Sequence, residues 1–347
     1  MSACTFGLDI AKRVFQVHWV DQDSRVHRRT LKRAEVIPYF ATCPAGLVAM
    51  EACGTAHYWA RRLASCGHEV RLISAQFVRP FVKTNKSDAA DAEAIWEAVQ
   101  RPGMRFVAVK SEDQQAVLGL HRIRSLLVKF RTMQVNQLRG LLGEFGTILP
   151  LGRKVMMPEV SRRLADVEGA GIPGLLLDAL RDQLTQLQGI DEQIRSIEQR
   201  IRGWQRRAED CRRIAEIPGV GLITATAAVA VIGDAKTFKS GREFAAYVGL
   251  VPRHRGTGGK VRMLGISKRG DTYLRTLLVH GARAVLLARQ RPGQTVDPWL
   301  ARLMERRHKN VAIVAIANKL ARVIWAVLAH GRTYQSDWRS ESARAIA

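Results

Sequence analysis

Acidic residues are scarce in this sequence of 347 residues. It contains 31 Asp and Glu against 55 Lys and Arg, which gives a formal net charge of +24. A net charge of this size is larger than solubility requires, so it predicts a polyanionic partner, with nucleic acid as the first candidate. Residues 1–108 hold 15 basic and 10 acidic side chains, a balance of +5, so the remaining +19 belongs to the rest of the chain.

Patterned cysteines and histidines are also lacking. The five cysteines include no C-x-x-C pair, and none of the nine histidines has metal-ligand spacing, so neither a disulfide framework nor a zinc site is indicated. The N-terminus has no signal-peptide features, and the apolar stretch from Val311 to Ala329 contains Asn318, Lys319 and Arg322. We expect reduced thiols, a packed helix in place of a membrane span, and a cytoplasmic protein.

An α/β layer fold is predicted for the first hundred residues. Short apolar or alternating runs at residues 5–11 and 15–21 indicate a strand-turn-strand opening. Further strands are predicted at 27–32, 47–54 and 68–74, with a helix at 56–65. Three hairpin-like strands followed by strand-helix-strand are typical of an α/β layer.

Four carboxylates stand out in this region. Asp is disfavoured in strands, so Asp9 near the end of the first strand points to chemistry, although a surface Asp in a turn is the alternative. Glu51 ends a buried strand, and Asp88 and Asp91 lie three apart in the first turn of a later helix. Acids there also complement the helix dipole. Together the four suit a site for two divalent ions, which need several hard oxygen ligands.

The middle of the chain is predicted to be helical and basic. No acid occurs between residues 121 and 139, and the cations are Arg122, Arg124, Lys129, Arg131 and Arg139. A solvated helix face explains part of this, and nucleic-acid binding is the alternative. The apolar residues from Leu187 to Trp204 step by three and four, the spacing of a coiled-coil seam, which requires a partner helix in the same chain or in a second copy. Residues 149–172 contain prolines and glycines and read as a hinge or linker.

Two glycine-rich segments near the C-terminus are candidates for phosphate binding. Ile217-Pro-Gly-Val-Gly221 resembles the hairpin of a helix-hairpin-helix element, where the backbone at Gly219 and Gly221 can reach a phosphate; an ordinary helix-helix turn is the alternative. Between residues 252 and 275 there are seven basic residues and one acid. A Gly-rich loop carrying a hydroxyl between cations is suited to hold a scissile phosphate. The cations proposed as contacts are Arg253, Arg255, Lys260, Arg262, Lys268 and Arg269, with His254 a weaker candidate.

At this point the sequence resembles a known family, the bridge-RNA-guided DEDD transposases of the insertion-sequence 110 family, nearest to its 1111 subgroup. The motifs G-L-D-I-A-K, M-E-A-C-G-T, N-K-S-D-A-A-D-A, I-P-G-V-G and K-V-R-x-L-G-I-S-K-R-G-D-x-Y-L-R occur in the family's order and span nearly the whole chain. The resemblance implies a ribonuclease-H-like (RuvC-type, resolvase-like) N-terminal domain at 1–110. It also implies a basic helical and coiled-coil region at 111–210 and a mostly α-helical C-terminal transposase domain at 211–347.

The resemblance also implies site residues. Matched position by position, the DEDD tetrad is Asp9, Glu51, Asp88 and Asp91, holding two Mg²⁺ ions, with Mn²⁺ as a substitute. The family uses a serine in the C-terminal loop as a nucleophile that forms a covalent intermediate with DNA. The matching position here is Thr257, which departs from the family's serine. Ser240 and Ser267 are the nearest other serines, and both look like helix-start or turn residues.

The resulting interpretation is a DNA recombinase that excises and inserts its own mobile element. Its expected partners are donor and target DNA, a noncoding guide (bridge) RNA, and further copies of itself in a dimer or tetramer. No membrane is expected, and the location is the bacterial cytoplasm with its nucleoid. Two alternatives stay open: a metal-dependent Holliday-junction resolvase-like nuclease, which needs no hydroxyl-bearing loop, and a non-enzymatic nucleic-acid-binding protein, which leaves the four carboxylates unexplained.

Overall fold

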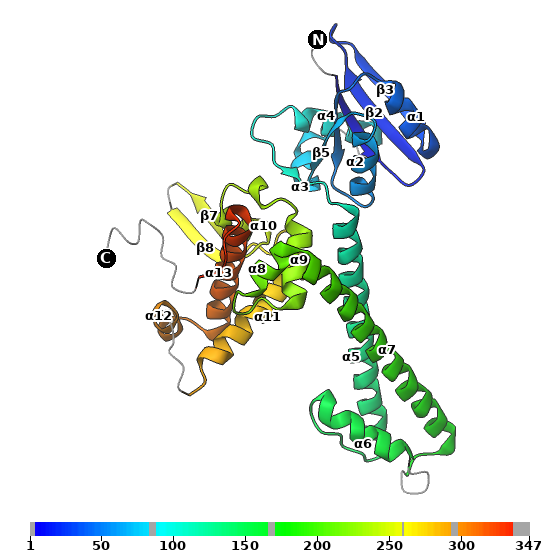
Figure 1. Ribbon diagram of the computed structural model, residues 1–347, viewed down its shortest axis with the longest axis vertical. Helices are drawn as coiled ribbons and strands as arrows, with labels where there is room; N and C mark the ends of the chain where they lie inside the picture. Colours follow the sequence, from blue (N-terminus) through cyan, green and yellow to red (C-terminus); the bar gives the residue numbers. More distant parts are fainter. Residues whose placement is uncertain (1–3, 83–87, 166–170, 259, 293–297, 336–347) are drawn as a thin grey trace. The chain divides into compact units, whose positions relative to one another are not determined.

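The chain forms two compact units (Figure 1). The computed structural model describes residues 4–82, 88–165, 171–258, 260–292 and 298–335. One unit comprises residues 1–112 together with 232–237, and the other comprises residues 113–231 and 238–347. The first is a mixed α/β unit and the second is mostly helical, as the sequence predicts.

A six-stranded sheet organises the first unit, in the order β3-β2-β1-β4-β5-β6. Strands β1, β4 and β5 are parallel, β2 runs antiparallel to both β1 and β3, and β6 runs antiparallel to β5. The strands are β1 (Thr5–Ile10), β2 (Val14–Val20), β3 (Val26–Lys32), β4 (Leu47–Glu51), β5 (Glu69–Ile73) and β6 (Phe106–Val107). The strands predicted from the sequence are confirmed, with β4 ending at the predicted acid, Glu51.

Helices cover both faces of this sheet. Side chains alternate along β1, so Phe6 and Leu8 enter a core with α1 and α2, whereas Gly7 faces α4. A second core joins α4 to β4 and β5 on that other face. The helical segments of the unit are η1 (Arg33–Glu35), α1 (Val36–Thr42), α2 (Ala56–Ala64), α3 (Ala75–Val78), η2 (Arg79–Phe81), α4 (Asp88–Val99) and η3 (Ala235–Thr237).

The second unit contains long helices and one separate two-stranded sheet. Its helices are α5 (Glu112–Glu144, whose first residue belongs to the first unit), α6 (Arg153–Ala165), α7 (Gly174–Arg207), α8 (Glu209–Ala215), α9 (Leu222–Ile232), α10 (Gly241–Tyr247), α11 (Thr272–Arg289), α12 (Pro298–Arg306) and α13 (Lys309–His330). The sheet consists of β7 (Pro252–Thr257) and β8 (Lys260–Ile266).

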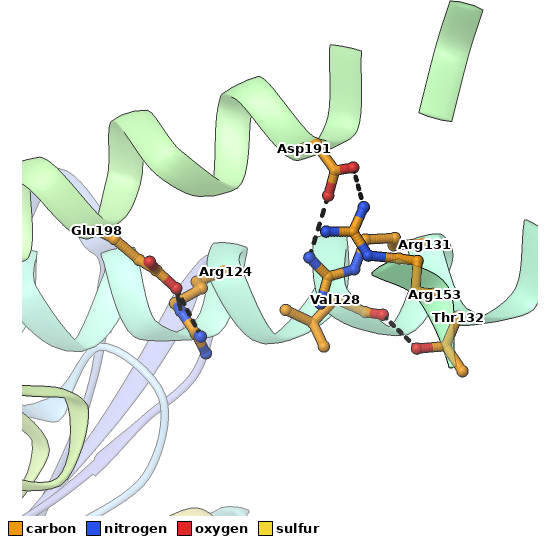
Figure 2. A network of polar contacts seen from close by, with 7 residues as sticks. All are labelled: Arg124, Val128, Arg131, Thr132, Arg153, Asp191 and Glu198. Atoms are coloured by element: carbon orange, nitrogen blue, oxygen red, sulfur yellow. Dashed lines mark hydrogen bonds and ion pairs between the residues drawn. The ribbon is translucent and has the colours of Figure 1, made fainter. Parts of the chain in front are cut away.

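Helices α5 and α7 lie side by side and run antiparallel (Figures 1 and 2). Arg124 Nη2 lies 2.7 Å from Glu198 Oε1. About two turns later in α5, Arg131 Nη1 lies 3.1 Å from Asp191 Oδ1. Successive residues of α5 therefore meet earlier residues of α7. The partner of the apolar seam predicted from Leu187 to Trp204 is thus a helix of the same chain, and the seam residues Leu187, Ile194, Ile197 and Ile201 are buried.

Residues 149–172 contain the helix α6, which corrects the prediction of a hinge or linker. Met156, Val160 and Leu164 recur every four residues and are buried with residues of α5 and α7 in one core. Pro158 lies inside the helix and removes one backbone hydrogen bond. The linker interpretation gave too much weight to this proline, because burial of an amphipathic face outweighs that loss.

Helix α13 packs in the core of the second unit, against α10 and α11, as the sequence predicts. Asn318 Nδ2 donates a hydrogen bond to the carbonyl oxygen of Leu250, 3.2 Å away. Within the described residues α13 is the one helix whose length and composition suit a membrane crossing, and 44% of its apolar window is buried inside the protein. Its buried side chains, which include Ile313, Ile316 and Ile324, pack within the second unit as those of a core helix do.

Candidate active site

Two carboxylates lie side by side at the carboxyl ends of parallel strands. The register of β1 and β4 pairs Leu8 with Met50. The next residues are Asp9 in β1 and Glu51 at the end of β4, and both are half-buried. Neighbouring strands lie about 4.8 Å apart, and in-register residues of parallel strands point to the same face. Asp9 and Glu51 are thereby brought together, as the sequence analysis expects of its strand-end acids.

Helix α4 crosses this face of β1 in the opposite direction to the strand. The Trp96 indole donates a hydrogen bond to the carbonyl oxygen of Thr5, 3.0 Å away. Two residues further along β1, a Cβ on Gly7 would stand 2.2 Å from the carbonyl oxygen of Ala92. The glycine is therefore required for the helix to approach the strand so closely. Moving forward along β1 corresponds to moving backward along α4.

Extended along ideal elements, the same progression directs the first turn of α4 toward Asp9, but the described carboxylates of Asp9, Glu51 and Asp91 do not form a group that could hold a metal ion. Two strand residues advance about 6.7 Å, and one helical turn covers about 5.4 Å. From Gly7 to Asp9 the facing residues of α4 therefore shift by one turn, from Ala92 to the helix start at Asp88. Asp91 in that turn is half-buried, whereas the side chain of Asp88 lies outside the described part of the chain.

Cys53 lies beside the acidic pair and had no role in the sequence analysis. Burial raises the pKa of its thiol, and the negative charges of Glu51 and Asp9 raise it further. Both carboxylates are thus near this sulfur. The sequence feature that could have indicated this placement is that Cys53 follows Glu51 by two residues. Among the described side chains no group of three His, Cys, Asp or Glu is arranged to hold a metal ion, and the carboxylate of Asp88 is not part of that set.

The basic segment predicted as a Gly-rich loop is a β-hairpin, which corrects that prediction. Strands β7 and β8 pair antiparallel and place Thr257 opposite Lys260 at the tip. Gly258, after Thr257, has φ = +57°, a conformation that glycine adopts without strain. Backbone groups that a loop would turn toward a phosphate are paired in a ladder, and Thr257 is exposed. Phosphate contacts at the hairpin therefore depend on side chains.

One face of the hairpin is cationic. Directly opposite residues share a face, so Thr257 and Lys260 lie on the same side as Arg255 and Arg262. Arg255 and Arg262 are themselves opposite each other, and like charges in that position destabilise a free hairpin. Contact with a polyanion removes this repulsion. Arg253 is exposed at the irregular start of β7, and His254 lies on the opposite face.

The serines near the hairpin have local roles, as the sequence analysis expects. Ser240 is the N-cap of α10, where its Oγ accepts a hydrogen bond from the Glu243 amide, 3.3 Å away. Ser267 Oγ accepts from the Arg269 amide at 3.5 Å, in the turn before α11. Lys268 and Arg269 in that turn are exposed, so both cations can reach a phosphate.

Arg275 is a residue that the sequence analysis counted only as one more cation. It is buried in the first turn of α11, and its Nη1 donates to the carbonyl oxygens of Val248, at 2.8 Å, and Arg269, at 3.0 Å. These carbonyls lie before β7 and after β8. Arg275 therefore fixes the two ends of the hairpin segment to α11, and its signal in the sequence was the motif Gly270-Asp-x-Tyr-Leu-Arg275.

The turn at residues 217–221 packs tightly on α11. Gly219 has φ = +88°, and a Cβ on Gly281 of α11 would stand 2.1 Å from the Gly219 carbonyl oxygen. Backbone conformation and close approach thus explain Gly219 without a phosphate. Gly221 is exposed just before α9, with no heavy atom within 4 Å of a Cβ placed there. Of the two glycines, Gly221 has the more accessible position for a phosphate contact.

The four α5 cations predicted to bind nucleic acid fall into two groups (Figure 2). Arg124 and Arg131 pair with acids of α7, and Asp191 also accepts from Arg153 of α6. These arginines hold helices together, a role hidden in the sequence because their partners are 74 and 60 residues away. Arg122 and Lys129 are exposed and free to contact a phosphate backbone by their position.

Two family profiles match the chain. The profile described as "Transposase IS116/IS110/IS902 family" matches residues 211–296. A profile of DEDD transposases of the IS110 type, described as "Transposase", matches residues 6–146. The two matches fall on the segments that carry the hairpin and the acidic residues.

Several curated proteins are similar along almost their whole length. A probable family 20 transposase of Pseudomonas aeruginosa is 50% identical over 337 residues, covering 96% of this chain and 99% of its own. The transposase for insertion sequence element IS1111A of Coxiella burnetii is 43% identical over 330 residues, with 95% and 90% covered. The transposase for insertion sequence element IS1328 of Yersinia enterocolitica is 42% identical over 331 residues, with 94% and 97% covered.

Proposed function

Because the chain belongs to the IS116/IS110/IS902 family of transposases, we propose that it is a site-specific DNA recombinase that excises and inserts a mobile insertion sequence. The enzyme class, a DNA transposase, follows from the family. What we add is an acidic metal-binding site in the N-terminal unit, a hydroxyl nucleophile in the C-terminal unit, and guidance by a noncoding bridge RNA. The bacterial relatives support a place of action on nucleoid DNA in the cytoplasm.

The strand arrangement supports a ribonuclease-H-like catalytic domain at residues 1–110. In the sheet order β3-β2-β1-β4-β5, only β2 is antiparallel to β1, and Asp9 lies on the central strand β1. Central parallel strands present their carboxyl ends together, where sites in open α/β sheets form. The antiparallel pair α5 and α7 supports a coiled-coil arm within residues 111–210, and the rest, 211–347, is the transposase domain.

The acidic residues Asp9, Glu51, Asp88 and Asp91 are proposed to hold Mg²⁺, with Mn²⁺ as a substitute. Their fit is supported by Asp9 and Glu51 ending neighbouring parallel strands, and by the antiparallel course of α4 over β1, which directs its first turn toward Asp9. Carboxylate oxygens are the hard ligands that these ions prefer. When bound, two such ions supply positive charge at the attacking and leaving oxygens of a phosphodiester.

The hairpin residues are proposed to carry out and support the attack on DNA. The Thr257 hydroxyl gives up its proton and forms a phosphate ester with the scissile phosphorus, while the bond to the leaving deoxyribose oxygen breaks and that oxygen takes up a proton. Lys260 and Arg262 share the face of Thr257 and stabilise the negative charge that develops on the phosphate oxygens. Arg275 keeps the hairpin segment attached to α11 during this step.

Exposed cations are proposed to bind the DNA and the guide RNA. They lie on α5, at the hairpin and in the turn that follows it, and they include Arg122, Lys129, Arg253, Arg255, Lys268 and Arg269. Contacts of this kind go to phosphates and give affinity without sequence preference. An RNA that pairs with DNA would supply the sequence preference. RNA that copurifies with the protein should therefore map beside its own gene.

Self-association is proposed to use a second apolar stripe on α5. Ile123, Leu126, Phe130 and Met133 step by three and four residues and are all exposed. This stripe is distinct from the face of α5 that meets α7, because Arg124 and Arg131 lie on that other face. A continuous exposed stripe with heptad spacing fits a helix of another copy.

The adjacent placement of Asp9 and Glu51 at the ends of β1 and β4 is the observation that carries the catalytic proposal. We expect Asp9→Asn, Glu51→Gln, Asp88→Asn and Asp91→Asn each to abolish strand cleavage in Mg²⁺. Nucleic-acid affinity should stay within about threefold, because the phosphate contacts come from Lys and Arg elsewhere. Asp23→Asn, an exposed acid in the same unit, is the matched control. Full cleavage by two or more of the four variants would exclude the tetrad.

A further inference from the structure

The second face of the β7–β8 hairpin carries two exposed apolar side chains, Val261 and Met263, together with His254. In the register of the two strands, Gly256 is opposite Val261 and His254 is opposite Met263. These pairs alternate with the cationic pairs and so lie on the reverse side of the ribbon. Val261 is 65% exposed and Met263 is 64% exposed. Gly256 offers no side chain to cover Val261.

Exposed apolar side chains in such a setting need an explanation. Two large apolar residues on a short, highly charged ribbon lose the benefit of burial unless something packs on them. The hairpin and its following turn, residues 252–270, contain six Lys or Arg residues and no acid. The occupant of the apolar face must therefore also tolerate dense positive charge at close range. A nucleic acid combines a polyanionic backbone with flat apolar bases only a few ångströms away.

We propose that Val261 and Met263 pack against DNA bases at the step next to the phosphate that the cationic face holds, and keep that step unstacked. This rests on the proposed function, since it takes Arg255, Lys260 and Arg262 to bind the scissile phosphate. Apolar side chains of this kind open base steps when they are inserted into a duplex, at a cost that backbone contacts offset. Strand exchange requires bases beside the cut to leave their old partners, so an unstacked step is useful there.

The geometry of the ribbon allows one face to contact the phosphate while the other face contacts bases. Thr257 at the end of β7 and Val261 near the start of β8 lie close to the tip, on opposite faces of the ribbon. One insertion of the tip therefore brings the hydroxyl and cations to a backbone and the apolar pair to neighbouring bases. Arg275, which joins both ends of the segment to α11, provides the fixed base from which the ribbon can act on a duplex.

The test uses the full-length protein and four-way DNA junctions that each carry one 2-aminopurine, placed one to four nucleotides from the crossover. The fluorescence of 2-aminopurine rises when its base leaves the stack. We expect the wild-type protein to raise it severalfold at one or two positions. Val261→Ser with Met263→Ser should lose most of that rise while binding the junction within threefold of the wild type. Met263→Leu should keep the rise, because the leucine retains an apolar side chain.

Val155→Ser is the matched control, since Val155 on α6 is 62% exposed and far along the chain from the hairpin. It should leave the fluorescence unchanged. An equal rise in the wild type and the double variant, or no rise with a wild type that cleaves the junction, would overturn the proposal. So would a double variant whose mass in light scattering falls while its fluorescence rise persists, because the face would then be a protein interface.

The outcome is separable from that of the catalytic proposal. Asp9→Asn should still raise the fluorescence, because unstacking precedes cleavage and uses other residues. If Asp9→Asn and Glu51→Gln both cleave DNA normally, the acidic site is refuted while the fluorescence result for the apolar face stands. If Asp9→Asn fails to cleave and the double variant unstacks normally, the acidic site stands and the apolar face is refuted.

Discussion

His121 of α5, which is buried, and Tyr273 of α11, which is half-buried, are joined by a hydrogen bond, with His121 Nδ1 3.0 Å from the Tyr273 hydroxyl oxygen. On the other side of the ring, Nε2 lies 3.0 Å from Thr226 Oγ1. The Thr226 hydroxyl donates its single proton to the carbonyl oxygen of Leu222, at 2.7 Å. Nε2–H therefore donates to Thr226, and Nδ1 accepts from Tyr273. A neutral imidazole satisfies every partner.

This arrangement predicts a loss of stability in acid. Burial, helped by the positive charge of Arg124, lowers the pKa of His121 from 6.5 to about 4. At pH 7 the ring is neutral in both the folded and the unfolded chain. As the pH falls below 6.5, His121 becomes protonated in the unfolded chain but stays neutral in the folded chain. The free energy of unfolding therefore falls by about 3 kcal/mol toward pH 4.

The measurement is the Tm of the wild type and of His121→Gln between pH 7.5 and 4.5. Glutamine keeps a donor and an acceptor but does not titrate, so the Tm of the variant should fall less steeply. His57 has a pKa lowered to about 4 by burial and by Lys110, and it contributes equally to both curves. Parallel curves for the two proteins would contradict the prediction.

The contact between Gly219 and Gly281 predicts a position where one methyl group is costly. In Gly281→Ala the new Cβ meets the Gly219 carbonyl oxygen at 2.1 Å, so α11 or the turn at 217–221 must move. We expect a loss of about 1–3 kcal/mol, the usual cost of overpacking. Gly189→Ala is the control, because nothing lies within 4 Å of a Cβ there and alanine favours the helix by about 0.5–1 kcal/mol. Calorimetry on both variants should show Tm shifts of opposite sign.

The four candidate acids could be named from the sequence because their signals are local. Asp9 in an apolar strand, Glu51 at a strand end and Asp88 at a helix start each follow from patterns within a few residues, and the sheet register then brings the first two together. The approach of α4 to β1 depends on Gly7 having no side chain. That contact joins residues more than eighty positions apart, so no local sequence pattern predicts it.

Two of the errors arose where long-range packing decided the structure, and one arose from a local signal that was misread. Proline and glycine content made residues 149–172 look like a linker, whereas burial against α5 and α7 stabilises α6. Glycines also made residues 253–262 look like a loop, although Thr257-Gly-Gly-Lys260 between alternating residues is a hairpin signal. Arg124 and Arg131 looked like phosphate contacts because the acids that pair with them are distant in the sequence.

The exposed stripe on α5 predicts how the protein associates. Leu126→Glu with Phe130→Glu should lower the mass measured by light scattering, because a helix of a second copy no longer finds an apolar seam. Arg122 and Lys129 flank the stripe, so two copies repel each other there. Raising the salt from about 0.1 M to about 0.5 M screens this repulsion and should strengthen the association of the wild type.

The control for the stripe is Val155→Glu with Leu175→Glu, two exposed apolar residues on α6 and α7. This variant should keep the wild-type mass. Equal masses for all three proteins at both salt concentrations, with and without nucleic acid, would show that the stripe is not an interface.

The last prediction concerns Thr257, which takes the place of the serine that the family resemblance implies. Its position explains the substitution, because Thr257 ends strand β7 and β-branched residues are favoured in strands. The β-methyl restricts the side chain to few rotamers. Gly258, which follows Thr257, has φ = +57° and open space around it, so the backbone there has room to direct the hydroxyl at a phosphate. These features suit Thr257 to the nucleophilic role that we propose for it.

Substitution separates this role from that of a residue that merely hydrogen-bonds the phosphate while water attacks. Thr257→Ser should keep or raise activity, since it retains the hydroxyl and removes the methyl. Thr257→Val keeps the shape and loses the hydroxyl, so it should abolish covalent protein–DNA adducts on a nicked suicide substrate and slow cleavage by roughly 10³-fold or more. Thr132→Val, at an exposed threonine of α5, should form adducts normally. Adducts that persist in Thr257→Val would move the search to Ser267 and Ser240; Ser240 is the less suitable of these because its hydroxyl caps α10.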